Sequence, residues 1–295
     1  MQSQRLLATE YFESLQSGIC SALETVDGKE RFSEDSWKHD SGGGGRTRII
    51  QNGLVWEKGG VSTSAIQDML TETLAEKLGV SPQAVFATGV SLVLHPLNPM
   101  IPTVHANFRY LELENGDFWF GGGADLTPYY LFRDDVVHFH RTWKDSCDKH
   151  NPAFYPRFKS SCDEYFFLQH RKEARGVGGI FFDYLRGDFK SLFQFVKSCG
   201  DSFLPAYLPI AERRKNEPWG DTEREWQLVR RGRYVEFNLV YDRGTLFGME
   251  TRGRIESVLM SLPPLVRWTY DHHPDEGSRE EELLLTLQSP QTWIS

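Results

Sequence analysis

The residues with the clearest chemical potential form a short alternating run, His105-Ala106-Asn107-Phe108-Arg109. Alternate side chains of a β-strand point to the same face, so a strand here would place His105, Asn107 and Arg109 on one side. An imidazole, an amide and a guanidinium in a row could bind an anionic ligand and exchange protons with it. The same pattern is also typical of a sheet face covered by water, and the residues alone leave both interpretations open.

A second run, Ser91-Leu92-Val93-Leu94-His95, alternates in the same way. If its strand lies next to the first one, Ser91 and His95 share a face with His105 and Arg109.

A glycine triplet, Gly121-Gly122-Gly123, follows an aromatic strand pattern and precedes Asp125. Three glycines suggest that the backbone approaches a ligand or another chain closely. Asp125 is then either a turn residue or a carboxylate directed into a site, and its spacing alone does not decide between them.

Cationic side chains gather in the last quarter of the chain. Arginine suits bidentate contacts with carboxylate or phosphate, although ion pairs with neighbouring acids would explain the same cluster. The cluster consists of Arg230, Arg231, Arg233, Arg243, Arg252 and Arg254.

These residues need elements to position them. The patterns predict strands over 47–51, 54–57, 85–94, 104–114, 117–120 and 177–183, and a hairpin of strands over 233–242 and 245–250. They predict helices over 3–25, 62–79, 133–149, 158–175, 188–204, 255–261 and 279–288. We interpret the Ser41–Gly45 stretch (SGGGG) as a slack connector. Strands that arrive mainly as hairpins favour one α+β domain over residues 1–295, built on an antiparallel sheet.

Composition excludes several classes. The chain has 295 residues and a formal charge of −8, whereas nucleic-acid and anionic-membrane binders normally carry net positive charge. Its apolar stretches fall far short of the roughly 20 residues of a spanning helix, so we expect no integral membrane association. Four cysteines without a CxxC pair, and acids at Glu10 and Glu13, predict a cytoplasmic protein without a targeting peptide.

Several long motifs together resemble the oxygen-dependent coproporphyrinogen III oxidase family. They are CDEYFFLQHRKEARGVGGIFFD at 162–183, GGGADLTP at 121–128, RRGRYVEFNLVYDRGTLFG at 230–248 and SLPPLVRW at 261–268. The resemblance spans nearly the whole chain. One departure is Arg252-Gly253-Arg254, where the family has a small residue in place of Arg252; Arg254 matches the family arginine.

The resemblance implies a broad, flat antiparallel sheet with helices on both sides, and a homodimer. It implies oxidative decarboxylation of two propionates of coproporphyrinogen III, on rings A and B, to vinyl groups. Molecular oxygen is the oxidant, and protoporphyrinogen IX, carbon dioxide and hydrogen peroxide leave, on the way to haem.

The resemblance also assigns site residues. His105 matches the family's acid–base residue, Asp125 would accept pyrrole N–H bonds, and Arg109 and Arg254 would bind propionates. The other implied substrate contacts are Ser91, Asn107, Tyr234, Glu236, Asn238 and Gly253.

No cofactor other than the co-substrate O2 is implied. Some bacterial relatives are described as metal-dependent through histidines that match His95, His105, His140 and His170, and others as metal-free. No HExxH or 2-His-1-carboxylate motif is visible, so we expect no required metal. A tetrapyrrole carrier without catalysis and a mononuclear metal oxygenase are the alternatives from other classes.

Overall fold

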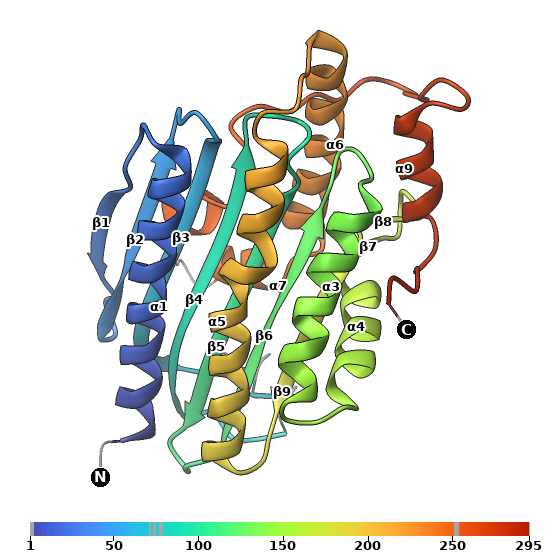
Figure 1. Ribbon diagram of the computed structural model, residues 1–295. Helices are drawn as coiled ribbons and strands as arrows, with labels where there is room; N and C mark the ends of the chain where they lie inside the picture. The colour runs from blue at the N-terminus through green and yellow to red at the C-terminus, as the bar shows by residue number, and fades with distance from the viewer. Residues whose placement is uncertain (1–2, 71, 73–74, 77–78, 251–253, 295) are drawn as a thin grey trace.

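A broad antiparallel sheet forms the centre of the computed structural model, which describes residues 3–70, 72, 75–76, 79–250 and 254–294 (Figure 1). Its strand order is β1-β2-β3-β4-β5-β6-β9. Consecutive strands up to β6 pair with each other, as hairpin connections dictate. The strands are β1 (Ser33–Lys38), β2 (Gly43–Gln51), β3 (Trp56–Met69), β4 (Ala84–Pro96), β5 (Thr103–Leu113), β6 (Phe118–Thr127) and β9 (Gly178–Leu185), and a separate pair is formed by β7 (Phe167–Leu168) and β8 (Glu173–Ala174).

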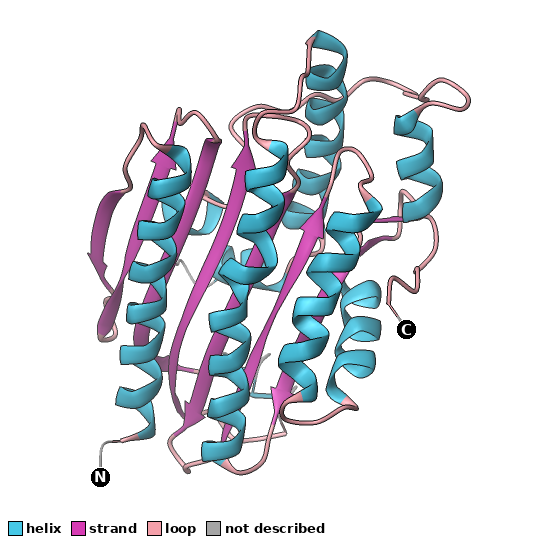
Figure 2. Ribbon diagram, in the orientation of Figure 1, coloured by secondary structure: helices cyan, strands magenta, loops and turns pink. Residues whose placement is uncertain are grey.

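Helices cover both faces of this sheet. Helices α1, α3 and α5 lie in front of it in the view of Figure 2, and α6 and α7 lie behind it. The predicted α+β class, with an antiparallel sheet between helices, is therefore confirmed. The helices are α1 (Gln4–Asp27), α3 (Arg133–Asp148), α4 (Phe154–Tyr165), α5 (Phe189–Arg214), α6 (Asp221–Val240), α7 (Arg243–Glu250), α8 (Ile255–Leu259) and α9 (Arg279–Leu287).

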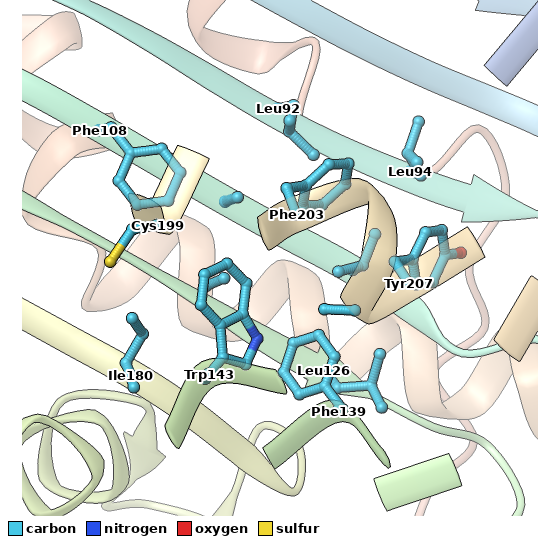
Figure 3. Packing of buried hydrophobic residues seen from close by; sticks show 14 of the residues in the cluster. Leu92, Leu94, Phe108, Leu126, Phe139, Trp143, Ile180, Cys199, Phe203 and Tyr207 are labelled. Carbon is cyan, nitrogen blue, oxygen red and sulfur yellow. The ribbon is translucent and has the colours of Figure 1, made fainter. Parts of the chain in front are cut away.

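The face toward α3 and α5 is the apolar core. Strand residues such as Leu92 and Phe108 pack there against Trp143 of α3 and Phe203 of α5 (Figure 3). Each is at most 1% exposed, and burying such a side chain contributes roughly 1.5–3 kcal/mol. Because side chains alternate along a strand, residues 91, 93, 105 and 107 must then lie on the opposite face.

The register aligns the predicted chemical residues on that opposite face. Ser91 of β4 pairs with Asn107 of β5, and Val93 pairs with His105. His105 in turn pairs with Asp125 of β6. The two alternating runs are neighbouring strands, so the condition for Ser91 and His95 to share a face with His105 and Arg109 is met. Asp125 lies within a strand, so its interpretation as a turn residue is wrong.

The helix predicted over 62–79 is wrong for its first half. Residues 62–69 belong to β3, which pairs with β2 on one side and β4 on the other. Ser62 and Ser64 alternate with the more buried Val61 and Thr63, and this period of two outweighs the apolar spacing that suggested a helix. The glycines Gly43–Gly45 are part of β2 rather than a slack connector.

The hairpin predicted over 233–250 is also wrong, because this segment forms the end of α6 and all of α7. Its alternating aromatic and aliphatic residues mimic a strand. The contacts of α6 with Pro96 and His95 of β4 and with Arg175 come from Arg231, Tyr234 and Asn238, respectively. These three residues are spaced three and four apart, as on one helix face. The helix predicted over 158–175 ends earlier, at Tyr165, where the β7–β8 hairpin follows.

Candidate active site

A buried carboxylate, that of Asp125 on β6, lies on the polar face of the sheet opposite the apolar core. The Nδ1 atom of His105 donates to Oδ1 of Asp125 at 2.9 Å. Arg175, which follows β8, donates to the same carboxylate through Nη2 at 2.7 Å and Nε at 3.2 Å. The Asp125 and Arg175 side chains are each 2% exposed, whereas His105 is 21% exposed. The sheet therefore presents a fixed ion pair with a partly accessible imidazole beside it.

Hydrogen bonds continue from this pair into the covering helix. Arg175 Nη1 donates to Oδ1 of Asn238 on α6 at 2.9 Å, and Asn238 Nδ2 donates to Ser261 Oγ at 3.2 Å. The carbonyl of Ser261 accepts from His95 Nε2 at 2.8 Å. One chain of contacts thus joins β6, β8, α6 and β4, so the position of Asp125 depends on the packing of all four.

The carboxylate of Asp125 stays ionised in this environment. Burial alone would raise the pKa of Asp125, but the Arg175 cation and the His105 hydrogen bond outweigh burial and hold the pKa below its usual value. Arg175 also lies against the rings of Phe166, Tyr234 and Phe237, with 4.1, 4.6 and 4.7 Å from its central carbon to the ring centroids. Aromatic faces stabilise a cation that water cannot reach.

Arg109 of β5 lies on the same face, and one strand, β6, separates it from Asp183 of β9. Its Nη1 donates to Oδ1 of Asn107 at 2.9 Å, and its Nη2 lies 3.0 Å from Oδ1 of Asp183 on β9. The strand between them, β6, carries Gly121 at this level, and a Cβ there would lie 2.7 Å from Nε of Arg109. The first glycine of the triplet therefore leaves room for the arginine to cross the sheet.

The third glycine of the triplet serves strand pairing. Gly123 has φ +159°, and a Cβ on it would lie 2.3 Å from the carbonyl oxygen of Ile180 on β9. The predicted close approach of backbone at the triplet is thus an approach of β6 to β9.

The remaining implied substrate contacts lie on neighbouring elements. Arg254 caps α8 and pairs with Asp35 of β1. Ser91 is half-buried on β4, and Gly253 lies outside the described residues. Tyr234 of α6 is 2% exposed, and its buried hydroxyl finds no hydrogen-bond partner within the described part of the chain.

Two of the four candidate metal-ligating histidines are buried and neutral. Burial, and then the charge of Arg231, lower the pKa of His95 well below its usual value; His95 Nδ1 contacts Thr103 Oγ1 at 3.2 Å. Burial lowers the pKa of His140 to about 3. On α3, His140 contacts the Val177 carbonyl through Nε2 and the Tyr155 hydroxyl through Nδ1. Both ring nitrogens of each histidine are thus used by the protein.

His170 lies elsewhere, in the turn between β7 and β8. Its Nε2 lies 2.7 Å from Oε2 of Glu236, and its Nδ1 lies 2.9 Å from the hydroxyl of Tyr241. Glu236 also accepts hydrogen bonds from Arg171, Arg233 and Trp268. These contacts hold the hairpin on α6 and occupy both carboxylate oxygens of Glu236.

The described residues hold no group of three or more His, Cys, Asp or Glu side chains arranged to bind a metal ion. His95, His105, His140 and His170 come from β4, β5, α3 and the β7–β8 turn, and the fold does not assemble them into one such group.

Sequence reasoning missed two residues of this face, Arg175 and Asp183. Both lie inside the 162–183 motif. A signal for Arg175 was available, since a buried carboxylate needs a cation. Nothing in the spacing relates Asp183 to Arg109, because the two meet only across β6.

The protein is of the α+β class, and one face of its sheet carries a buried, charge-compensated carboxylate beside a histidine, with arginines on the same face. The sequence profile of coproporphyrinogen III oxidase matches residues 8–293. The chain belongs to the coproporphyrinogen III oxidase family.

Curated relatives carry the same description. The chain is 51% identical to the chloroplastic oxygen-dependent coproporphyrinogen-III oxidase of Glycine max, over 95% of this chain and 77% of that protein. It is 47% identical to the oxygen-dependent coproporphyrinogen-III oxidases of Prochlorococcus marinus strains MIT 9312 and AS9601, over 96% of this chain and 90% of each relative. Within the described residues, no helix is long and apolar enough to cross a membrane.

We predict that Arg175→Met destabilises the protein by about 3–5 kcal/mol, because it leaves the Asp125 carboxylate buried without its cation. The double variant Arg175→Met/Asp125→Asn should recover part of this loss, since it removes the uncompensated charge. Urea denaturation at pH 7 measures both. A double variant no more stable than Arg175→Met would contradict the pairing argument.

We predict that Glu236 makes the protein lose stability in acid. Burial alone would raise the pKa of Glu236, but Arg171 and His170 lower it from 4.5 to about 2. A lowered folded-state pKa gives stability that is present above about pH 4.5 and lost as the pH falls toward 2.

Between pH 5 and pH 3 the unfolding free energy of the wild type should therefore fall more steeply than that of Glu236→Gln, by about 1 kcal/mol after solvent screening. Parallel pH profiles of the two proteins in urea would contradict this prediction.

Proposed function

We propose that this chain catalyses the oxygen-dependent oxidative decarboxylation of two propionates of coproporphyrinogen III to vinyl groups, which gives protoporphyrinogen IX for haem biosynthesis. Membership of the coproporphyrinogen III oxidase family supports the reaction. The observation that carries the proposal is the buried Asp125 between His105 and Arg175, because the substrate needs a fixed hydrogen-bond acceptor and a proton source side by side.

The reaction's balance defines what the residues must do. For each ring, R–CH2–CH2–COO⁻ + O2 + H⁺ gives R–CH=CH2 + CO2 + H2O2. Two electrons pass from the substrate to oxygen, and one proton is consumed in each turnover. The protein must therefore hold a macrocycle with four carboxylates, stabilise the positive charge that builds up as electrons leave, and deliver one proton.

Asp125 fits the charge-stabilising role. Its carboxylate remains ionised next to Arg175, and it would accept N–H bonds from the reacting pyrroles. His105 fits the proton-delivering role, since its Nδ1 is held by Asp125 and its ring is partly accessible. With Nδ1 protonated toward Asp125, Nε2 is the atom that exchanges the proton.

Cations and amides on the same face would orient the macrocycle. In this proposal Arg109 and Arg254 bind propionates, and Ser91 and Asn107 supply hydrogen bonds from β4 and β5. Among the α6 residues, Asn238 and Tyr234 contact Arg175, and Glu236 contacts the β7–β8 turn. We therefore assign Asn238 and Tyr234 to positioning of the Asp125–Arg175 pair, and Glu236 to anchoring of the hairpin.

The test of the proposed function is the absorption spectrum of the product after incubation of purified protein with coproporphyrinogen III. We expect protoporphyrinogen IX under air and unchanged substrate under nitrogen. Binding of the tetrapyrrole without turnover under air would show a carrier instead of an enzyme and refute the proposal.

Asp125→Asn should fold normally and lose roughly 100-fold or more in kcat, because it keeps the shape of the side chain and removes a charge that acts in the transition state. Asp117→Asn removes an exposed carboxylate that pairs with Arg186 outside the site, and it serves as the control. Near-normal kcat in Asp125→Asn, or a loss explained by a lower melting temperature, would contradict the assigned role.

We further propose that no metal is required. The support is the chemistry of His95 and His140, whose ring nitrogens are all engaged by protein partners. Chelator-treated, metal-depleted protein should keep most of its activity. Loss of turnover that one specific divalent ion restores would promote His95, His105, His140 and His170 to ligands.

The active unit is proposed to be a cytoplasmic homodimer. Exposed apolar side chains near the end of α6 and in the segment that follows α8 support an interface between two copies; they include Leu239, Val240, Leu265 and Trp268. Light scattering should give twice the 34.0 kDa chain mass at micromolar concentration. A fully active protein of monomer mass would exclude the dimer.

A further inference from the structure

Both arginines proposed to bind propionates already hold carboxylates of this chain. Nη2 of Arg109 lies 3.0 Å from Oδ1 of Asp183, and Arg254 pairs with Asp35. A substrate carboxylate that takes the Nη2 edge of either guanidinium must replace the internal carboxylate there. The surroundings of the Arg109–Asp183 pair show how such a replacement can take place.

The Arg109–Asp183 pair is built by the sheet. The Arg109 side chain, on β5, passes over Gly121 of β6 and reaches Asp183 on β9. Oδ1 of Asp183 also accepts a hydrogen bond from the backbone N–H of Tyr184 at 3.0 Å. Asn107 holds the other side of the guanidinium. Arg109 is thus oriented toward the Asp183 carboxylate, which lies on the edge strand of the sheet.

The pair is accessible, unlike the pair at the centre of the site. The side chains of Arg109 and Asp183 are 32% and 18% exposed, whereas those of Arg175 and Asp125 are each 2% exposed. Half-solvated ion pairs contribute little net free energy, because water competes for both partners. A second carboxylate with better geometry therefore displaces Asp183 at small cost, which is not true of Asp125.

Arg243 offers the displaced carboxylate a second cation. At the start of α7, its Nη2 lies 3.8 Å from Oδ2 of Asp183, whereas Arg109 lies nearest to Oδ1. Its guanidinium lies over the ring of Tyr165 at 4.7 Å. A small rotation of Asp183 exchanges one arginine for the other without leaving its charge alone.

We propose that Asp183 is an internal competitor that occupies Arg109 and passes to Arg243 when a substrate carboxylate binds, and that Asp35 competes for Arg254. The inference deepens the proposed function and rests on it. Competition of this kind weakens the binding of every tetrapyrrole carboxylate, and it returns a partner to Arg109 when the product leaves. Asp183 thus sets affinity and product release rather than the chemical step.

The test uses oxidised coproporphyrin III, a tetracarboxylate that requires no turnover, in a fluorescence titration of the purified full-length protein. We expect Asp183→Asn to lower the Kd about three- to fivefold, the range of an exposed ion pair. Adding Asp35→Asn should lower it further, to about tenfold in total. The matched control Asp117→Asn, which removes the same charge beside Arg186, should leave the Kd unchanged.

A double-mutant cycle separates local competition from long-range charge. In an Arg109→Ala background, Asp183→Asn should give no gain, because there is no guanidinium to release. A gain that persists in that background, or a Kd that rises in Asp183→Asn, overturns the proposal. If Asp183→Asn and Asp183→Ser both fail to fold, Asp183 is a structural anchor and the proposal is wrong.

The outcome is distinguishable from failure of the proposed function. A wild type that binds coproporphyrin III and shows the predicted cycle, yet turns over no coproporphyrinogen III, would refute the activity and keep the competition. A wild type with normal turnover and no gain in Asp183→Asn would do the reverse.

Discussion

The buried ion pair between Asp125 and Arg175 is the interaction on which the arrangement of the site depends. A carboxylate that is 2% exposed cannot remain charged unless a cation and donors compensate for the water it has lost. Here the cation comes from the chain after β8, the donor from His105 on β5, and a further contact to the cation from Asn238 on α6. The sheet, the β7–β8 hairpin and α6 can therefore pack in only one relative position without leaving a charge unpaired.

The ion pairs on this face are of two kinds, which differ in how far water reaches their side chains. Arg175–Asp125 is dry and surrounded by Phe166, Tyr234 and Phe237, so breaking it costs several kcal/mol. Arg109–Asp183 is partly hydrated, so exchanging its carboxylate costs little. A binding site for a ligand with several carboxylates needs both kinds, because the first kind keeps the reacting geometry fixed while the second yields to the ligand.

Period-two patterns made the strand part of the site predictable from sequence. His105, Asn107 and Arg109 alternate with residues that the core requires, so their common face follows from burial alone. The same reasoning gave a wrong prediction for α6. Tyr234, Glu236 and Asn238 also alternate, but they belong to a helix. A local sequence pattern cannot detect the tertiary contacts that favour the helix. Partners across strands, such as Asp183 for Arg109, were out of reach because register decides them. Family resemblance supplied the activity, which no spacing could have provided.

The ion pair between Arg175 and Asp125 also determines how His105 is held beside the carboxylate. The charge of Asp125 is already balanced by Arg175, so the hydrogen bond from His105 fixes the orientation of the imidazole and does not have to compensate the carboxylate alone. Because Nδ1 is held by Asp125, the proton exchange proposed above falls to Nε2 of a ring whose side chain is 21% exposed. The proposed reaction consumes one proton for each vinyl group formed, and a histidine that a fixed carboxylate holds at one nitrogen keeps the same orientation from one proton transfer to the next.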